Sequence, residues 1–216
     1  MKREIWIGLC GRSGTGKGYV SHIFAKNGVP AVDTDAVYRE LTKPGNELSP
    51  CMIELIGAFG DAVRNDDNSL NRKKLAEIVF RDGGSADLQK LNHITHKHIL
   101  EKTKVIAEDF FASGAKAVLI DAPVLFESGF DAFCSCTVCV TAPLAVSVKR
   151  IIKRDGISEE DALRRLNSQV SEEELIRLCD YRIVNGENEE TLEEQVAEIL
   201  VKIFASCPET EVGCEQ

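Results

Sequence analysis

The fold is decided by the stretch GRSGTGKG at Gly11–Gly18. It follows an apolar run, EIWIGLC at residues 4–10, and precedes a helical pattern over residues 17–26. The two outer glycines and Lys17 have the spacing of a phosphate-binding loop, in which backbone N–H groups turn inward to hold phosphate oxygens. The lysine of such a loop reaches the β- and γ-phosphates as a point charge. Because strand, loop and helix fall in register, the stretch predicts nucleotide binding.

Gly18 departs from the usual pattern, in which a Ser or Thr follows the lysine and its hydroxyl ligates Mg²⁺. Mg²⁺ commonly keeps several waters and binds through phosphates plus one or two carboxylates. We therefore expect a water molecule at the position of the hydroxyl. The loss of one such ligand predicts a cost of about 1–3 kcal/mol, or roughly tenfold to a hundredfold in rate or metal affinity.

Short apolar runs alternate with longer helical segments along much of the chain. This alternation predicts an α/β fold in which a parallel sheet is covered by helices on both faces. The runs expected to form strands after the first one are VPAVD (29–33), AVLIDA (117–122), SCTVCVT (135–141) and YRIVN (181–185). The predicted core of a single domain comprises residues 1–44 and 116–205.

Two helical regions interrupt or extend this core. Between residues 45 and 115 the strand pattern vanishes and amphipathic helical patterns replace it, which predicts a helical insertion. After Pro143 the pattern is helical again and is broken at Asp155-Gly156, so a lid is expected at about residues 150–170. We expect residues 206–216 to form a flexible tail.

Composition excludes several classes of protein. A net charge of −9 over 216 residues argues against a nucleic-acid binder, whose surface would be basic. No stretch resembles a signal peptide or a membrane span, so we expect a cytoplasmic protein without a membrane partner. Among the eight cysteines, Cys136 and Cys139 have CxxC spacing, but no second such pair accompanies them. No zinc site is therefore indicated, and the cysteines are expected to be reduced. Cys134, Cys136 and Cys139 are interpreted as packing residues of a strand, and Cys207 and Cys214 lie in the tail.

Three aspartates follow predicted strands, at the edge where open α/β sheets bind ligands. We interpret Asp35 as the base that accepts the proton of an attacking hydroxyl, and Asp33 as a structural, metal-associated or substrate-side residue. The alternative is that one of these two caps a helix starting at Ala36. Asp121 closes its apolar run as a Walker-B-like acid that holds Mg²⁺ directly or through water, or else serves only as a turn acid before Pro123.

Basic side chains recur near the predicted lid. Arg150 and Arg154 are interpreted as residues that neutralise charge on the triphosphate, the alternative being a solvated charged face. For Arg164 and Arg165 we favour the solvated face. Among the histidines, His96 is assigned to ligand contact, although its i, i+3 spacing from His93 equally suits ordinary helix packing.

Taken together, the motifs resemble those of the dephospho-coenzyme A kinase family over nearly the whole chain. The resemblance rests on the phosphate loop, VDTDAVYRELTKPG, FGDAV with LNRKKLAEIVF, LNHITHKHI, DAPVLFESGF, KRIIKRDGISEEDALRRLNSQVSEEEL and DYRIVNG. It implies a P-loop NTPase three-layer fold with a five-stranded parallel sheet, a helical substrate domain and an arginine-bearing lid. The implied reaction is the ATP-dependent phosphorylation of the ribose 3′-hydroxyl of dephospho-CoA.

The resemblance also implies roles for individual residues. The catalytic residues would be Asp35, Lys17, Arg150 and Arg154. The nucleotide-binding residues would be Gly11, Arg12, Ser13, Gly14, Thr15, Gly16, Lys17, Gly18, Asn185 and Gly186. The substrate would be bordered by Pro123 and Glu127. We also assign Asp33 and His96 to substrate binding, and Asp121 to the metal ion. The departures from the family pattern are Gly18 for Ser, Arg12-Ser13 for Gly-Ile, and Lys97 for Pro.

Two alternatives differ in function. One is a kinase of another nucleoside or nucleotide, and the other is a diverged nucleotide-binding protein without catalysis. The presence of Lys17, Asp35 and the lid arginines favours catalysis, with ATP and Mg²⁺ as implied ligands. A monomer or weak homo-oligomer is expected.

Overall fold

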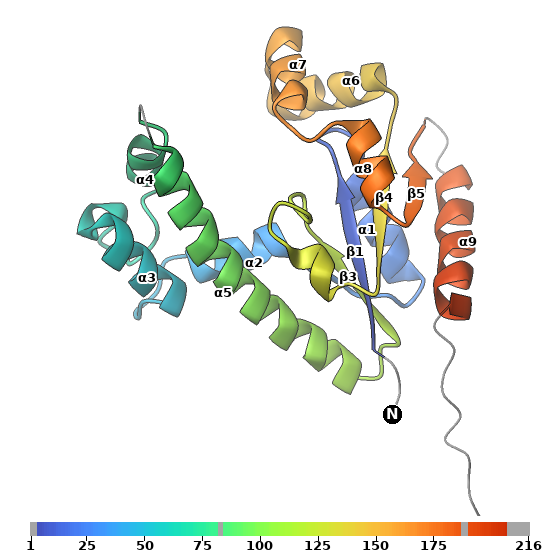
Figure 1. The fold of residues 1–216 in the computed structure, drawn as a ribbon, viewed down its shortest axis with the longest axis horizontal. Helices are drawn as coiled ribbons and strands as arrows, with labels where there is room; N and C mark the ends of the chain where they lie inside the picture. Colours follow the sequence, from blue (N-terminus) through green and yellow to red (C-terminus); the bar gives the residue numbers. More distant parts are fainter. Residues whose placement is uncertain (1–3, 82–83, 187–189, 207–216) are drawn as a thin grey trace, which may run out of the picture. The chain divides into compact units, whose positions relative to one another are not determined.

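The central strand of the protein is β1 (Ile5–Gly11), which leads directly into the phosphate loop (Figure 1). The computed structural model describes residues 4–81, 84–186 and 190–206. Five strands form one sheet in the order β2-β3-β1-β4-β5, in which β1 runs parallel to both of its neighbours. The other strands are β2 (Ala31–Asp33), β3 (Ala117–Asp121), β4 (Cys136–Thr141) and β5 (Tyr181–Val184). The predicted α/β fold with a five-stranded parallel sheet is confirmed.

Alternation along β1 divides its side chains between the two faces of the sheet. Ile5, Ile7 and Leu9 belong to the main buried cluster, whereas Cys10 contacts the thiol of Cys179 on the other face. Both faces are apolar, as expected for a parallel strand that is covered on both sides.

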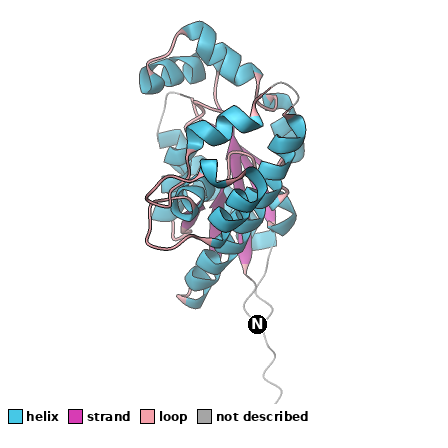
Figure 2. Cartoon of the chain, turned by 90° about the vertical axis from the view of Figure 1, so that its left-hand side faces the viewer, coloured by secondary structure: helices cyan, strands magenta, loops and turns pink. Residues whose placement is uncertain are grey.

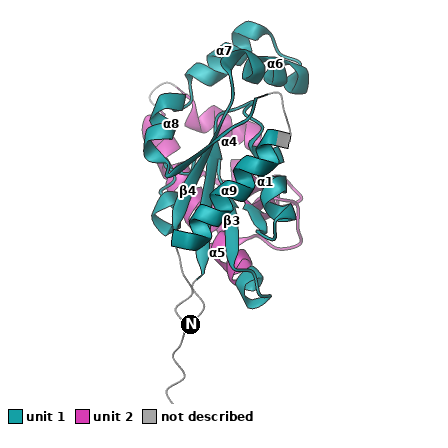
Figure 3. Cartoon of the chain, turned by 90° about the vertical axis from the view of Figure 1, so that its right-hand side faces the viewer, with its two compact units in different colours: residues 1–32, 109–216 teal, residues 33–108 magenta. Residues whose placement is uncertain are grey.

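By its internal contacts the chain divides into two compact units, residues 1–32 with 109–216 and residues 33–108 (Figure 3). The strands lie together in the sheet, and the other described elements are helices and loops (Figure 2). The first unit contains α1 (Lys17–Lys26), η2 (Phe130–Phe133), α6 (Leu144–Asp155), α7 (Glu159–Asn167), α8 (Glu172–Leu178) and α9 (Glu190–Ser206).

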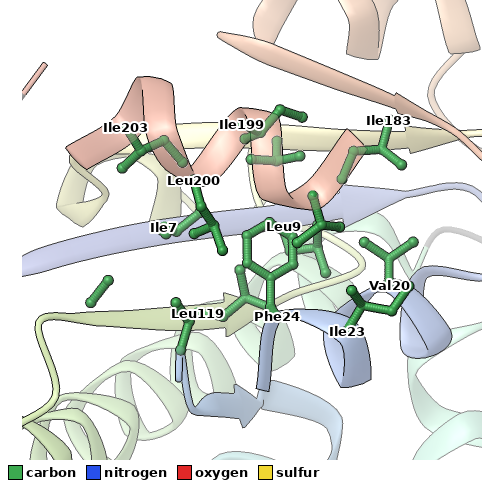
Figure 4. Packing of buried hydrophobic residues seen from close by; sticks show 14 of the residues in the cluster. Ile7, Leu9, Val20, Ile23, Phe24, Leu119, Ile183, Ile199, Leu200 and Ile203 are labelled. Atoms are coloured by element: carbon green, nitrogen blue, oxygen red, sulfur yellow. The ribbon is translucent and has the colours of Figure 1, made fainter. Parts of the chain in front are cut away.

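The main core of the first unit lies between the sheet and the pair α1 and α9. Phe24 of α1 and Ile199 of α9 pack with Leu9 and Leu119 from the strands (Figure 4). The helix α1 ends as predicted, because Asn27 caps it and Gly28 follows with a φ of 80°. A smaller cluster, which includes Ile151 and Leu166, holds α6 against α7. The predicted break at Asp155-Gly156 separates these two helices.

The second unit is helical and has a core of its own. Its elements are α2 (Thr34–Leu41), α3 (Pro50–Phe59), η1 (Asp61–Val63), α4 (Arg72–Val79) and α5 (Ser85–Ala112), the last of which continues into the first unit. Met52 and Leu55 of α3 pack with Leu75 of α4 and Ile94 of α5. Lys97 lies within α5, and its Nζ donates to Glu54 Oε1 at 2.7 Å. The boundaries of this unit fall at 33 and 108, whereas the expected insertion covered residues 45–115.

No helix in the described ranges is long and apolar enough to cross a membrane. The expected tail at residues 206–216 and its two cysteines, Cys207 and Cys214, lie outside the described residues except for Ser206, the last residue of α9.

Candidate active site

The phosphate loop connects β1 to α1 through a tight turn. Gly16 precedes the helix in the left-handed region, at φ 82° and ψ 23°. Thr15 is buried, and its backbone N–H and its hydroxyl both donate to the carbonyl oxygen of Arg12, at 3.3 and 2.8 Å. These bonds hold the arch of the loop, residues 11–16, in place. They do not use the backbone N–H groups of the first turn of α1. The start of α1 therefore presents N–H groups and the positive end of the helix dipole, as an anion site requires.

Lys17 and Asp121 form an ion pair at the loop. The Nζ of Lys17 donates to Asp121 Oδ1, and only 15% and 9% of the two side chains are exposed. Asp121 is the last residue of β3, and in the sheet it lies opposite Leu9 of β1. The adjacent positions of β1 and β3 explain why residues 104 apart in sequence meet. The pair provides one ammonium group and one carboxylate beside the place where phosphate would bind.

Arg150 of α6 connects the loop to the end of β5. Its Nη1 lies 3.4 Å from the carbonyl oxygens of both Gly14 and Thr15. Its Nη2 donates to Asn185 Oδ1 at 3.2 Å and to the carbonyl of Gly186 at 3.1 Å. The structure thus brings Arg150, Asn185 and Gly186 to the phosphate loop, as the sequence suggested for the nucleotide site.

Asn185 is buried and also contacts the loop directly. Its Nδ2 donates to the carbonyl oxygen of Thr15 at 2.7 Å. A Cβ at Gly16 would collide with this carboxamide, and a Cβ at Gly14 would collide with the backbone of Ser147 in α6. These two glycines are required by close approach as well as by their positive φ values.

Gly18 has neither constraint. Its φ is outside the left-handed region, it is exposed, and a Cβ built there meets no atom within 4 Å. The local structure would therefore accept Ser, so the absence of the hydroxyl has no steric reason.

Arg12 contacts the last turn of α7, and Ser13 contacts the segment that follows it. A guanidinium N–H of Arg12 donates to the carbonyl oxygen of Leu166. The backbone N–H of Ser13 donates to Gln169 Oε1 at 3.0 Å, and Gln169 Nε2 lies 3.3 Å from Ser13 Oγ. Gln169 lies inside the family-like stretch from Lys149 to Leu175, but sequence reasoning gave it no role, because it stands in a short connection between two helices.

The second lid arginine lies elsewhere. Arg154 is exposed and makes two hydrogen bonds to the carboxylate of Asp155, at 2.8 and 2.9 Å. These bonds, together with one from Arg165, hold the pKa of Asp155 well below its ordinary value. The structure therefore does not bring Arg154 to the phosphate loop in the way it brings Arg150.

The two aspartates after β2 have different surroundings. Asp33 Oδ1 accepts the backbone N–H groups of Asp35 and Ala36, at 2.8 and 3.1 Å, and Asp33 Oδ2 lies 3.4 Å from Arg39. Asp33 thus caps α2, which confirms the capping alternative, although the helix begins at Thr34 and not at Ala36. Asp35 is an exposed carboxylate in the first turn of that helix.

The remaining substrate-side residues lie in both units. Pro123 and Glu127 are exposed residues of the turn that follows β3 in the first unit. His96 is half-buried on α5 in the second unit, where Glu54 of α3 pairs instead with its neighbours Lys97 and His98.

The described residues contain no group of three or more His, Cys, Asp and Glu side chains arranged to hold a metal ion. A site made from one carboxylate, phosphate oxygens and water needs no such group, and this is a common form of Mg²⁺ binding. Asp121 and the open space at Gly18 are compatible with that form.

Comparison with known proteins places this geometry in a family. The model of the dephospho-CoA kinase family matches residues 5–191. The dephospho-CoA kinase of Listeria monocytogenes serotype 4b is 36% identical over 190 residues, which cover 88% of this chain and 92% of that protein. The dephospho-CoA kinase of Corynebacterium efficiens is 35% identical over 201 residues, covering 91% of this chain and 98% of the relative.

Solved structures agree with the fold. A crystal structure from Thermus thermophilus has a TM-score of 0.77 at 28% identity and covers 94% of this chain and 99% of its own. A shikimate kinase from Acinetobacter baumannii, at 14% identity and a TM-score of 0.53, covers 95% of this chain and 96% of its own and shares the fold alone. With a matching family model over most of its length and relatives above 30% identity, the chain belongs to the dephospho-CoA kinase family.

Proposed function

We propose that this protein transfers the γ-phosphoryl group of ATP to the ribose 3′-hydroxyl of dephospho-CoA, giving CoA and ADP. Membership of the family supports the reaction. The observation that carries it is the phosphate loop, with Lys17 paired to Asp121 and with Arg150 and Asn185 fixed against its carbonyl oxygens. This arrangement offers amides and an ammonium group to a triphosphate.

Lys17 is assigned to the transferring phosphate. In the structure its ammonium group is held by a nearly buried carboxylate, so it is already positioned at the loop before a nucleotide arrives. Moving from Asp121 toward the β- and γ-phosphates would let it stabilise the negative charge that is redistributed during transfer.

Asp35 is assigned as the proton acceptor. Asp33 is engaged as a helix cap, so its carboxylate is held by two backbone amides. Asp35 would take the proton of the 3′-hydroxyl as that oxygen bonds to the γ-phosphorus and as the bond from the γ-phosphorus to ADP breaks. Helix α2 provides a rigid support for this group, and His96, Pro123, Glu127 and Asp33 are proposed to border the acceptor.

Mg²⁺ is proposed as the accompanying ion, held by Asp121 and by phosphate oxygens. When bound, the ion neutralises charge on the phosphates. The carboxylate of Asp121 lies at a strand end beside the loop, where it can serve such an ion directly or through water. Arg154 is proposed to belong to a lid formed by residues 150–170. The protein is proposed to be cytoplasmic and to be a monomer or weak homo-oligomer.

The test is a turnover assay of the full chain with ATP and Mg²⁺, in which the product is identified by its mass. Dephospho-CoA is compared with a panel of nucleosides and nucleotides. We expect a gain of one phosphoryl group on dephospho-CoA at its 3′ position. Transfer to a different acceptor, or ATP binding without transfer to any acceptor, would contradict the proposal.

A further inference from the structure

The contact between the phosphate loop and the end of α7 is not explained by nucleotide binding alone. One carboxamide, that of Gln169, reaches two polar groups of Ser13: its oxygen accepts the backbone N–H at 3.0 Å and its nitrogen lies 3.3 Å from the hydroxyl. Ser13 lies in the middle of the arch between Gly11 and Gly16. A two-point contact of this kind fixes the orientation of the arch as well as its position.

Arg12 makes a second connection from the same arch to the same segment. Its guanidinium donates to the carbonyl oxygen of Leu166, one of the last carbonyl groups of α7. A cation at the C-terminal end of a helix interacts favourably with the helix dipole. No carboxylate pairs with Arg12 among the described residues, so this contact is not a by-product of an ion pair.

The segment that holds the arch belongs to the lid. Leu166 is buried with Val148, Ile151 and Ala162 in the cluster that joins α7 to α6. The other side of the same helix pair reaches the loop through Arg150, which lies 3.4 Å from the carbonyl oxygens of Gly14 and Thr15. The helix pair α6–α7 is thus connected to the phosphate loop at two separated points.

Resting on the kinase function proposed above, we propose that Gln169 is a positioning residue that couples the phosphate loop to the α6–α7 lid. Through Ser13 it transmits the presence of a nucleotide in the loop to the last turn of α7, and Arg12 supports the same connection. Gln169 would act through the loop, without touching the reacting atoms.

Gln169 is half-buried and lies outside the main core of the unit. Its replacement should therefore change the coupling more than the fold. A residue that only stabilised the protein would affect thermal unfolding and would leave the response of the lid to nucleotide intact.

Hydrogen exchange of the full chain tests this coupling. The probe is a non-hydrolysable ATP analogue with Mg²⁺, used at saturation and without acceptor. In the wild type we expect the analogue to slow amide exchange in residues 157–169 by about tenfold. The reason is that a bound nucleotide would strengthen the contacts of Arg12 and Ser13 with this segment. In Gln169→Ala we expect most of this protection to be lost at saturation, and the Kd for the analogue to rise about tenfold, as for a lost hydrogen-bonded contact.

Two further variants separate coupling from stability. Asn167→Ala removes an exposed amide side chain two residues earlier and should behave like the wild type. Gln169→Glu keeps an oxygen for the N–H of Ser13 and a second oxygen that can accept its hydroxyl, so it should restore protection of the lid. Its added negative charge beside the loop should at the same time weaken binding of the analogue.

Equal protection of the lid in saturated wild type and Gln169→Ala would overturn the proposal. So would a loss in Asn167→Ala as large as that in Gln169→Ala. If Gln169→Ala does not fold, Ser13→Ala, which removes only the hydroxyl contact, must show a smaller loss in the same direction. Because these measurements need no acceptor, a wild type that protects its lid but makes no CoA would refute the proposed reaction while supporting the coupling.

Discussion

At the scale of single residues, Gly18 changes the chemical groups that the loop offers to a metal ion, but the backbone conformation does not require a glycine there. Gly14 and Gly16 are held by close neighbours and by positive φ, whereas Gly18 has neither. A serine would therefore fit without moving the backbone. In the proposed Mg²⁺ site the cost of lacking one would fall on the metal, because water would take the place of a side-chain hydroxyl.

Gly18→Ser should consequently bind Mg²⁺·ATP about tenfold more tightly, since one protein ligand or hydrogen bond is added. Titration calorimetry of the nucleotide at several Mg²⁺ concentrations measures the change. Gly57→Ser, at another exposed helical glycine with open space around it, is the matched control and should leave binding unchanged. Weaker binding by Gly18→Ser would show that the glycine serves the approach of a substrate.

The two aspartates after β2 allow a separation of stability from catalysis. Asp35→Asn should lower kcat by at least about a hundredfold, because a general base is lost. Asp33→Ala should instead lower the free energy of unfolding by about 1 kcal/mol, because the cap of α2 is lost. Asp33→Asn should retain most of that stability.

Initial rates and urea unfolding of the three variants measure both effects. Normal turnover in Asp35→Asn would remove the assignment of this residue as the base.

At the scale of elements, α1 carries the phosphate loop on a firmly packed support. Phe24 is completely buried between the sheet and α9, while Val201 on α9 is 69% exposed. Val20 and Ile23 are buried in the same cluster, so packing holds α1 from its first turn to its last (Figure 4). This is the physical basis for treating the loop as preorganised.

Phe24→Ala should lower the free energy of unfolding by about 3–5 kcal/mol, the usual range for a large side chain removed from a core. The exposed counterpart, Val201→Ala, should change it by less than about 0.5 kcal/mol. Urea denaturation followed by circular dichroism compares the two. Similar effects of both substitutions would mean that α9 does not pack in the arrangement described.

At the scale of the whole molecule, the thiols couple stability to alkaline pH. Burial raises the pKa of Cys134 from 9.0 to about 12. A hydrogen bond with Cys10, together with burial, raises that of Cys179 from 9.0 to about 12. In the folded state these groups keep their protons at pH values where the unfolded chain has released them. Their contribution to stability is therefore complete below pH 9 and is lost as the pH rises toward 12.

The free energy of unfolding should thus fall between pH 9 and pH 11, by up to about 1.4 kcal/mol per pH unit for each of these thiols. Cys134→Ala should make the fall shallower. Urea unfolding at a series of pH values measures the slope. An identical slope in the variant would show that Cys134 does not contribute.

Much of the fold could be predicted because its signals are local. The runs that became β1 to β5, the helix after the loop and the break at Asp155-Gly156 each depend on a few neighbouring residues. Sequence also suggested that Asp33 or Asp35 caps a helix, and the structure identified Asp33, with a start at Thr34.

The contacts of Arg154 and Gln169 could not be predicted from the sequence. Helical spacing placed Arg150 and Arg154 together, yet only the first contacts the loop, since Asp155 holds the second. Gln169 lay within a stretch that carries the family resemblance but was given no role, because its partner Ser13 lies 156 residues away.

The sequence by itself determined the order of strands and helices along the chain, the strand–loop–helix unit and the chemical groups offered to a phosphate. These follow from periodicity, capping and the backbone freedom of glycine, which act over a few residues. Only the tertiary structure decided that Lys17 meets Asp121, that Asn185 and Arg150 meet the loop, and that Gln169 holds Ser13. Such pairs form between segments more than 100 residues apart, and strand order and side-chain packing bring them together where no local preference can.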